Sequence, residues 1–169
     1  YGNLRAIDVI LRMGAAHGLQ KVIVTPGGIL STPAASHLIR QRPAIGGIIL
    51  SASHNPGGPD GDFGVKVNGA NGGPTPASFT DAVYDCSKTL DGYSIVDAPA
   101  ISLQSPGHNM IGEMQVEVID GVDDFVLLMK QLFDFDSISA LIRNDFPLAF
   151  DAMHAVTGPY AKTLLEEVL

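Results

Sequence analysis

Helical and strand-like spacings of apolar residues alternate along the first 68 residues, and this alternation constrains the fold more than any other feature. Leu4, Ile7 and Leu11 share one helical face, whereas KVIV at 21–24 and AIGGIIL at 44–50 are short apolar runs typical of buried strands. The pattern predicts a first helix that ends near Gly18 and a second that starts at Thr32–Pro33 and stops before Pro43. It also predicts strands at 21–24, 44–50 and 64–68. This order predicts a layered mixed α/β sheet domain with a largely parallel or mixed sheet.

The rest of the chain continues the pattern around one irregular stretch, 91–114, which we predict to be a long surface loop with room for a short strand. The first predicted element is a helix capped by Thr75 and Pro76, which has an apolar face made of Phe79, Ala82, Val83, Cys86 and Leu90. A strand at 115–119, a helix capped by Asp120 and a short helix capped by Asp136 follow. The last elements are a strand beginning at PLAFDAM (147–153) and a helix from Thr157 and Pro159 to Leu169. Ser31 and Thr32 are expected helix caps, and Cys86 is expected in the core. Because the chain begins with a helix and ends on a strand and helix without partners, we expect a piece of a larger protein.

Composition excludes several classes of protein. With 46% hydrophobic and 17% charged residues, the 169-residue chain is typical of a globular protein of one domain, or one and part of another. No apolar run approaches the roughly 20 residues of a membrane span, and the N-terminus lacks the pattern of a signal peptide. The single cysteine, Cys86, allows no internal disulfide framework and favours a reducing, cytoplasmic location.

The net charge of −8 argues against nucleic acid as a partner, because a phosphate backbone is bound by a basic surface. A small phosphorylated substrate stays open, since a few local cations or backbone N–H groups suffice to bind one phosphate. We therefore expect a small-molecule partner, no nucleic acid and no membrane, while the oligomeric state is unknown from the sequence.

The candidate site is the segment LSASHNPGGPDGDFGVK at 50–66, which follows directly on an apolar strand. Adjacent Ser53 and His54 do not form a nucleophile–base dyad, and the G-x-S-x-G elbow of serine hydrolases is absent. Asp60 and Asp62 lack the further ligands of an EF-hand, and the P-loop spacing is missing before Lys66. The five histidines show no close metal-ligand pairing, and one cysteine cannot build a structural zinc site.

Two interpretations of this segment remain. Glycine-rich backbone can approach a phosphate closely and surround it with N–H groups, so that Ser53 could carry a phosphoryl group and Lys66 could transfer a proton. From spacing alone, a polar loop that merely closes a strand is the favoured interpretation. Asp60 and Asp62 are interpreted as loop-shaping or solvated residues, and Asp151 and His154, expected at the end of a strand, as structural.

Several stretches resemble the α-D-phosphohexomutases, within which they are most similar to glucose-specific phosphoglucomutases of the parafusin-like eukaryotic type. They are GGILSTPA, GGIILSASHNPGG, GDFGVKVN and FDAMHAVTGPY. The Ser-His-Asn-Pro string is specific to that superfamily, while Phe63–Gly64 and DAMH point to its glucose branch. The similarity covers most of 3–90 and 115–169. Ser51 stands where the family has threonine, and Ala155 where it has glycine.

The resemblance implies roles for three residues in a phosphoglucomutase reaction. Ser53 would be phosphorylated and would exchange its phosphoryl group with glucose 1-phosphate and glucose 6-phosphate through glucose 1,6-bisphosphate. His54 would help to organise substrate and phosphate, and Lys66 would be the acid/base group. The family's Mg2+ is bound by the Ser53 phosphate and by three aspartates of a D-G-D-G-D loop that does not occur here; DGD at 60–62 belongs to the serine loop.

The resemblance also implies an organisation into domains. Residues 1–135 would form phosphohexomutase domain 1 without its first strand, and 136–169 would start a second, similar domain. The family's metal loop, sugar loop and C-terminal phosphate-binding domain have no counterpart here, so this chain alone is expected to be inactive. Alternatives are a non-catalytic paralogue acting as a regulatory or binding module, and a hexomutase for another sugar phosphate.

Overall fold

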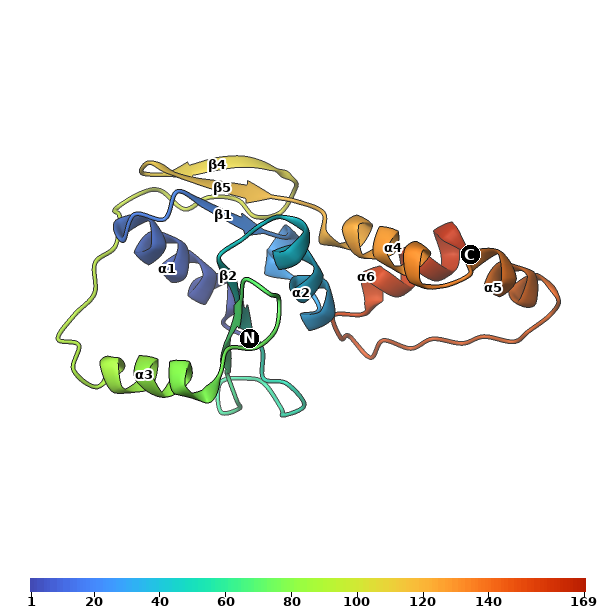
Figure 1. Cartoon of the computed structure of the whole chain (residues 1–169), viewed down its shortest axis with the longest axis horizontal. Helices are drawn as coiled ribbons and strands as arrows, with labels where there is room; N and C mark the ends of the chain where they lie inside the picture. Colours follow the sequence, from blue (N-terminus) through green and yellow to red (C-terminus); the bar gives the residue numbers. More distant parts are fainter.

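The structure, a computed structural model, describes residues 1–169 and contains helices, strands and long connections in one elongated arrangement (Figure 1). Its elements are α1 (Asn3–Ala16), β1 (Lys21–Val24), the 3-10 turn η1 (Pro26–Gly28), α2 (Thr32–Gln41), β2 (Gly46–Leu50), β3 (Val65–Gly69), α3 (Ala77–Ser87), β4 (Gly107–Ile111), β5 (Met114–Val118), α4 (Gly121–Leu132), α5 (Phe135–Arg143), α6 (Gly158–Ala161) and the π-helical segment η2 (Lys162–Val168). The predicted α/β class is confirmed. None of the helices combines the length and apolar character that crossing a membrane requires.

The strands form two separate sheets. One has the order β1-β5-β4, with β1 and β5 parallel and β4 and β5 antiparallel; the other is the antiparallel pair β2-β3. The sheet is therefore mixed, as predicted, but β2 and β3 are not hydrogen-bonded to it. Sequence patterns fix which face of a strand is apolar, whereas the choice of neighbouring strand depends on the tertiary structure.

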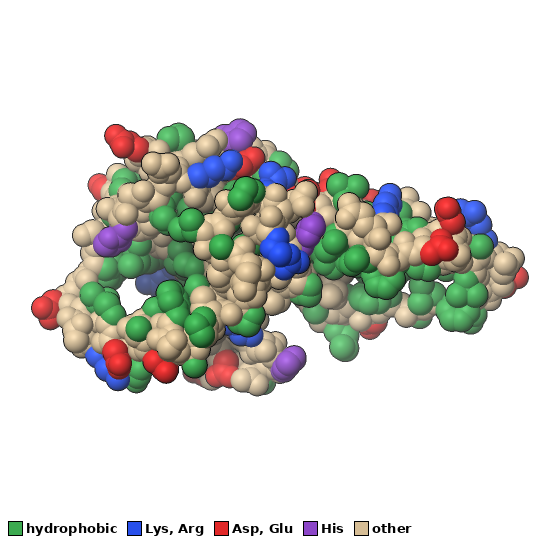
Figure 2. Space-filling view, viewed as in Figure 1, with side chains coloured by type: hydrophobic (Ala, Val, Ile, Leu, Met, Phe, Trp, Pro, Cys, Tyr) green, Lys and Arg blue, Asp and Glu red, His purple; other side chains and the backbone are tan.

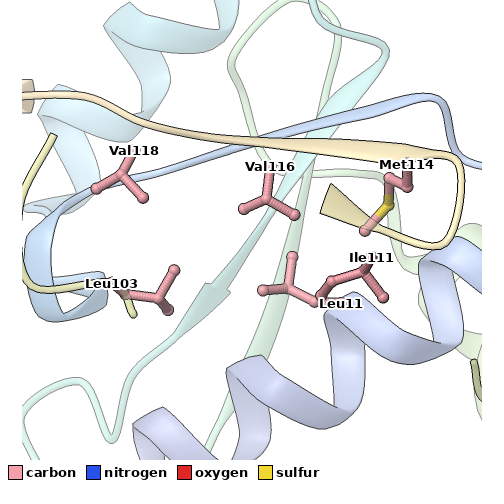
Figure 3. Close-up of a cluster of buried hydrophobic side chains, with 6 residues drawn as sticks. All are labelled: Leu11, Leu103, Ile111, Met114, Val116 and Val118. Atoms are coloured by element: carbon pink, nitrogen blue, oxygen red, sulfur yellow. The ribbon is translucent and has the colours of Figure 1, made fainter. Parts of the chain in front are cut away.

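The core lies between α1 and the inner face of the three-stranded sheet (Figure 3). Its six buried side chains are Leu11, Leu103, Ile111, Met114, Val116 and Val118. Along β5, burial alternates with the strand period of two, so that Gln115 and Glu117 lie on the opposite face. There the Lys21 ammonium lies 2.6 Å from a Glu117 carboxylate oxygen and lowers the pKa of Glu117. Burying each large apolar side chain contributes roughly 1.5–3 kcal/mol.

The prediction of a surface loop at 91–114 is corrected in part. Most of the stretch is exposed, but Leu103 is buried, and Val96, Ala98 and Ile101 pack against the core. The short strand expected within it is β4. The residues before β4 lack a regular period because they are irregular backbone, in which single apolar side chains reach the core without alternation.

Helix starts agree with the predictions to within two residues. Asp120 caps α4 as predicted, its carboxylate accepting a hydrogen bond from the Val122 N–H at 2.8 Å. Of the two caps expected for α2, Ser31 is confirmed and Thr32 is not, and Asp134 rather than Asp136 caps α5. Ser31 and Asp134 have extended backbone, whereas Thr32 and Asp136 already lie inside their helices, where their side chains cannot reach the free N–H groups.

Helix α3 is fully formed, but its predicted inward face is uncovered. It has no buried residue, Cys86 is exposed, and Figure 1 shows the helix lying apart from the others. Thr75 does not cap it; its hydroxyl instead donates a hydrogen bond to the Val67 carbonyl at 3.1 Å. An amphipathic pattern shows that a face is suited to burial, and burial also requires an opposing element, which this chain does not supply.

The strand predicted from 147 onwards is absent, because residues 147–150 have no neighbouring strand to pair with. The predicted last helix begins at Gly158, beside Thr157, and continues as η2. It docks through Tyr160, whose ring meets Phe125 of α4 edge to face with 5.3 Å between centroids. The Tyr160 hydroxyl accepts a hydrogen bond from the Ser31 N–H at 3.0 Å, which ties this segment to the start of α2.

Candidate active site

The segment singled out by the sequence is the connection between β2 and β3, at 51–64. The last ladder pair is Leu50 with Val65, and beyond it the Ser51 N–H donates to the Gly64 carbonyl at 2.9 Å, closing the neck of the loop. A Cβ on Gly64 would lie 2.5 Å from the Ser51 carbonyl oxygen. Glycine is therefore required at position 64 because the two backbones approach so closely.

Inside the neck, the loop is folded by its own hydrogen bonds. The Asp62 N–H donates to the Pro56 carbonyl at 3.0 Å, and the Asn55 side-chain amide donates to the Asp62 carboxylate. This contact confirms the loop-shaping role predicted for Asp62, whereas Asp60 is exposed and makes no side-chain hydrogen bond. The loop is consequently a defined structure despite its glycine content.

Ser53 is exposed and has φ of +60°, in the left-handed region that L-residues rarely adopt. Its N–H donates to the Ser51 hydroxyl oxygen at 2.9 Å, and the Asn55 N–H donates to the Ala52 carbonyl at 3.1 Å, so that hydrogen bonds enclose it on both sides. His54 is exposed beside it. Non-glycine residues in this conformation are concentrated at functional sites, where surrounding contacts hold them.

Lys66 lies on β3 at the base of the loop, directly across the ladder from Ile49. Successive cross-strand pairs alternate between the two faces of a sheet, so Lys66 is on the same face as the Ser51–Gly64 pair at the neck. It is exposed and makes no ion pair with a residue of this chain. The structure thus brings Ser53, His54 and Lys66 to one loop and its adjoining strand, with no hydrogen bond among their side chains.

The loop also presents hydrogen-bond donors. The backbone N–H groups of His54, Gly57 and Gly58 have no acceptor within the chain and are available to an anion. The Ser53 N–H is not available, because the Ser51 hydroxyl occupies it. We did not predict this role of Ser51 from the sequence. The signal was present, because in an ordinary serine turn the hydroxyl accepts a hydrogen bond from the N–H two residues later.

The chain does not contain a complete metal site. No group of three or more His, Cys, Asp or Glu side chains is placed to hold an ion, and Asp62 is already bound to Asn55. The DGD segment by itself therefore does not bring three such side chains together.

The second motif, DAMH at 151–154, lies in a turn and not at the end of a strand, which corrects the prediction. Met153 and His154 have φ of +46° and +62°. The Asp151 carboxylate accepts a hydrogen bond from the Met153 N–H at 2.9 Å, so Asp151 has the structural role predicted for it. His154 is exposed and makes no side-chain hydrogen bond.

Comparison with protein families relates this geometry to known proteins. Residues 2–94 match the family described as phosphoglucomutase/phosphomannomutase, alpha/beta/alpha domain I. The matched stretch includes the whole β2–loop–β3 unit and all three candidate residues.

Individual proteins give the same result. The chain is 53% identical over 169 residues to the phosphoglucomutase of Rhizobium radiobacter and 51% identical over 166 residues to that of Schizosaccharomyces pombe. It is 45% identical over 170 residues to the chloroplastic phosphoglucomutase of Arabidopsis thaliana. These alignments include 100%, 97% and 100% of this chain but only 31%, 30% and 27% of the three relatives.

The fold agrees as well. A crystal structure of the exocytosis-sensitive phosphoprotein parafusin, a phosphoglucomutase from Paramecium in its open form, superposes with a TM-score of 0.93 at 41% identity. The superposition covers 99% of this chain and 32% of parafusin. The chain thus spans about a third of the length of the proteins it matches.

Proposed function

This chain belongs to the phosphoglucomutase/phosphomannomutase family, and we propose that the protein containing it is a phosphoglucomutase that interconverts glucose 1-phosphate and glucose 6-phosphate. The observation that carries the proposal is Ser53, exposed at positive φ in a pre-folded glycine-rich loop of a chain 53% identical to a phosphoglucomutase. The activity belongs to the longer protein, because the chain spans only about a third of its relatives; alone, it is inactive.

The reaction is an exchange of phosphoryl groups at Ser53. With Ser53 phosphorylated, a free sugar hydroxyl attacks the phosphorus, a new P–O bond forms to the sugar, and the bond to Ser53 Oγ breaks. The resulting glucose 1,6-bisphosphate reorients, and Ser53 Oγ then attacks the other phosphorus and regains a phosphoryl group. Each transfer moves one proton from the attacking hydroxyl to the departing oxygen, and glucose 1,6-bisphosphate is both intermediate and activator.

The residues of the loop and of the adjoining strand have different roles in this exchange. Lys66, at the base of the loop, is the acid/base group that accepts and returns the proton. His54 helps to orient substrate and phosphate, and the free N–H groups of His54, Gly57 and Gly58 bind phosphate oxygens. The loop needs little rearrangement for this role, because its neck and interior are already hydrogen-bonded.

Mg2+ is the proposed cofactor, although the residues of this chain do not make a site for it. The phosphate on Ser53 would contribute one ligand, and the aspartate ligands would come from elsewhere in the longer protein. No step of the exchange is therefore assigned to Mg2+ on this chain.

The remaining proposals concern the organisation and setting of the protein. Residues 1–135 form the first phosphohexomutase domain and 136–169 start the second; the family match to 2–94 supports the first assignment. The partner is a small sugar phosphate, and we propose a cytoplasmic location. The alternative of a non-catalytic binding module is less well supported, because Ser53, His54 and Lys66 are all present.

The test is phosphorylation of the full-length protein by glucose 1,6-bisphosphate. A mass spectrum is expected to locate one phosphate on Ser53. Ser53→Ala is expected to lose this phosphate and to lower mutase turnover by at least about 10⁴-fold. The control is Ser94→Ala, an exposed serine outside the loop, which keeps both. Phosphate on another residue, or wild-type turnover in Ser53→Ala, contradicts the proposal.

A further inference from the structure

Ser51 makes the side-chain hydrogen bond that holds the backbone of Ser53. Its hydroxyl oxygen accepts the Ser53 N–H at 2.9 Å, and no other side chain bonds to that backbone. Ser51 is itself anchored, because its own N–H donates to Gly64 at the neck of the loop. A continuous path of hydrogen bonds therefore runs from β3 through Gly64 and Ser51 to Ser53.

This contact matters because Ser53 has left-handed backbone, with φ of +60°. An L-residue leaves this conformation readily unless neighbouring groups hold it there. Only two bonds do so: the Ser51 contact and the Asn55 N–H to the Ala52 carbonyl. The second joins backbone groups and is insensitive to side-chain identity, so Ser51 is the side chain through which this conformation is controlled.

We propose that Ser51 is a positioning residue for phosphoryl transfer, acting through the backbone of Ser53. Backbone φ determines the direction in which the Cα–Cβ bond leaves the chain, and hence where Ser53 Oγ meets an incoming phosphorus. A misplacement of about 1 Å at a reacting atom can slow a reaction by a factor of about 100. This inference rests on the proposed function of Ser53 and adds a requirement to it, namely a hydroxyl two residues earlier.

The experiment compares three variants of the full-length protein. Ser51→Ala removes the acceptor, Ser51→Thr retains a hydroxyl, and Ser102→Ala removes a similar serine contact, to the Gln104 N–H at 3.4 Å, outside the candidate site. For each variant, kcat and KM for glucose 1-phosphate, the rate of Ser53 phosphorylation by glucose 1,6-bisphosphate, and hydrogen exchange of the Ser53 amide are measured.

Ser51→Ala is expected to lower kcat and the phosphorylation rate by about 10- to 100-fold with KM changed less than about twofold, and to speed exchange of the Ser53 amide several-fold. Ser51→Thr should restore all three, and Ser102→Ala should match the wild type. Equal losses in Ser51→Ala and Ser51→Thr, or a wild-type rate in Ser51→Ala, overturn the inference. If the wild-type protein is not phosphorylated, the proposed function fails, and amide exchange alone decides whether Ser51 holds Ser53.

Discussion

Ser53 adopts a conformation that its neighbours in the sequence do not predict. Positive φ is expected at glycine, and the loop does place Gly58 at +125°, yet it also places Ser53 at +60°. The sequence indicated a glycine-rich loop around a serine. It did not indicate strain at the serine itself, because this depends on hydrogen bonds to the Ser51 hydroxyl and the Ala52 carbonyl that form only in the folded loop.

The acid/base role proposed for Lys66 can be tested against an ordinary surface lysine. In the full-length protein, Lys66→Ala is expected to lower kcat by about 10²–10⁴-fold, because proton transfer to the departing oxygen loses its donor. Lys88→Ala is the matched control: Lys88 is also exposed, its ammonium lies 3.0 Å from the Asp85 carboxylate, and kcat should stay within about a factor of two. A mutase assay at saturating glucose 1-phosphate makes the comparison. Equal rates for the two variants contradict the assignment.

Secondary structure was well predicted from sequence, whereas the residues at its ends were less so. Asp120 was recognised as a cap and Ser31 was one of the two caps expected for α2, but Asp134 caps α5 in place of Asp136. At both α2 and α5, residues able to cap stand close together, and the sequence alone does not select between them. The selection follows from where the preceding segment leaves the extended conformation, which tertiary contacts such as that of Tyr160 with Ser31 determine.

The cap at Asp134 predicts a pH dependence of stability. The Ser137 hydroxyl and then its N–H donate to the Asp134 carboxylate, and these bonds lower the pKa of Asp134 below its ordinary 3.8. The Asp134 cap therefore stabilises the fold fully when the pH is above the pKa that Asp134 has in the unfolded chain. This stabilisation is lost as the pH falls through the lower pKa that Asp134 has in the folded chain. Asp134→Asn keeps a capping oxygen but does not titrate, so the variant should be less stable than the wild type at pH 6, and the difference should shrink as the pH falls towards 2.

Urea unfolding of both forms from pH 2 to pH 6, with hydrogen exchange of the α5 amides, measures this difference. Asp136→Asn is the control, since Asp136 lies in the first turn of α5 and its side chain accepts no hydrogen bond. A difference between wild type and Asp134→Asn that grows towards acid pH has the opposite sign and rules out the cap as its cause.

Several apolar surfaces of the chain are exposed, and the sequence pattern alone does not predict what packs against them. One is the exposed face of α3, with Phe79 and Val83; another is an apolar groove of about 320 Å³ near the C-terminus. Figure 2 shows hydrophobic side chains on the visible surface of both regions. The periodicity of α3 correctly predicted an amphipathic helix but does not show which segment packs against it. Likewise, the apolar run at 147–150 predicted a strand but does not show whether a neighbouring strand is present to pair with it.

Val83 and Val126 allow the covering of α3 to be tested, because they are the same residue type in helices of different burial. Val83 is 51% exposed in α3 and Val126 is 6% exposed in α4. In the 169-residue chain, Val83→Ala is expected to change the free energy of unfolding by less than about 0.5 kcal/mol, and Val126→Ala to lower it by about 2 kcal/mol. We predict that the rest of the full-length protein packs on this face, so that Val83→Ala becomes destabilising there by more than about 1 kcal/mol.

Urea unfolding of both lengths, with and without each substitution, separates this effect from helix propensity. Alanine favours a helix over valine by a few tenths of a kcal/mol, and that gain is the same in both lengths and cancels in the comparison. Val126→Ala should cost the same in both, since its contacts lie within this chain. If Val83→Ala is equally neutral in the full-length protein, the apolar face of α3 stays exposed there, and the prediction that the rest of the same chain covers it is wrong.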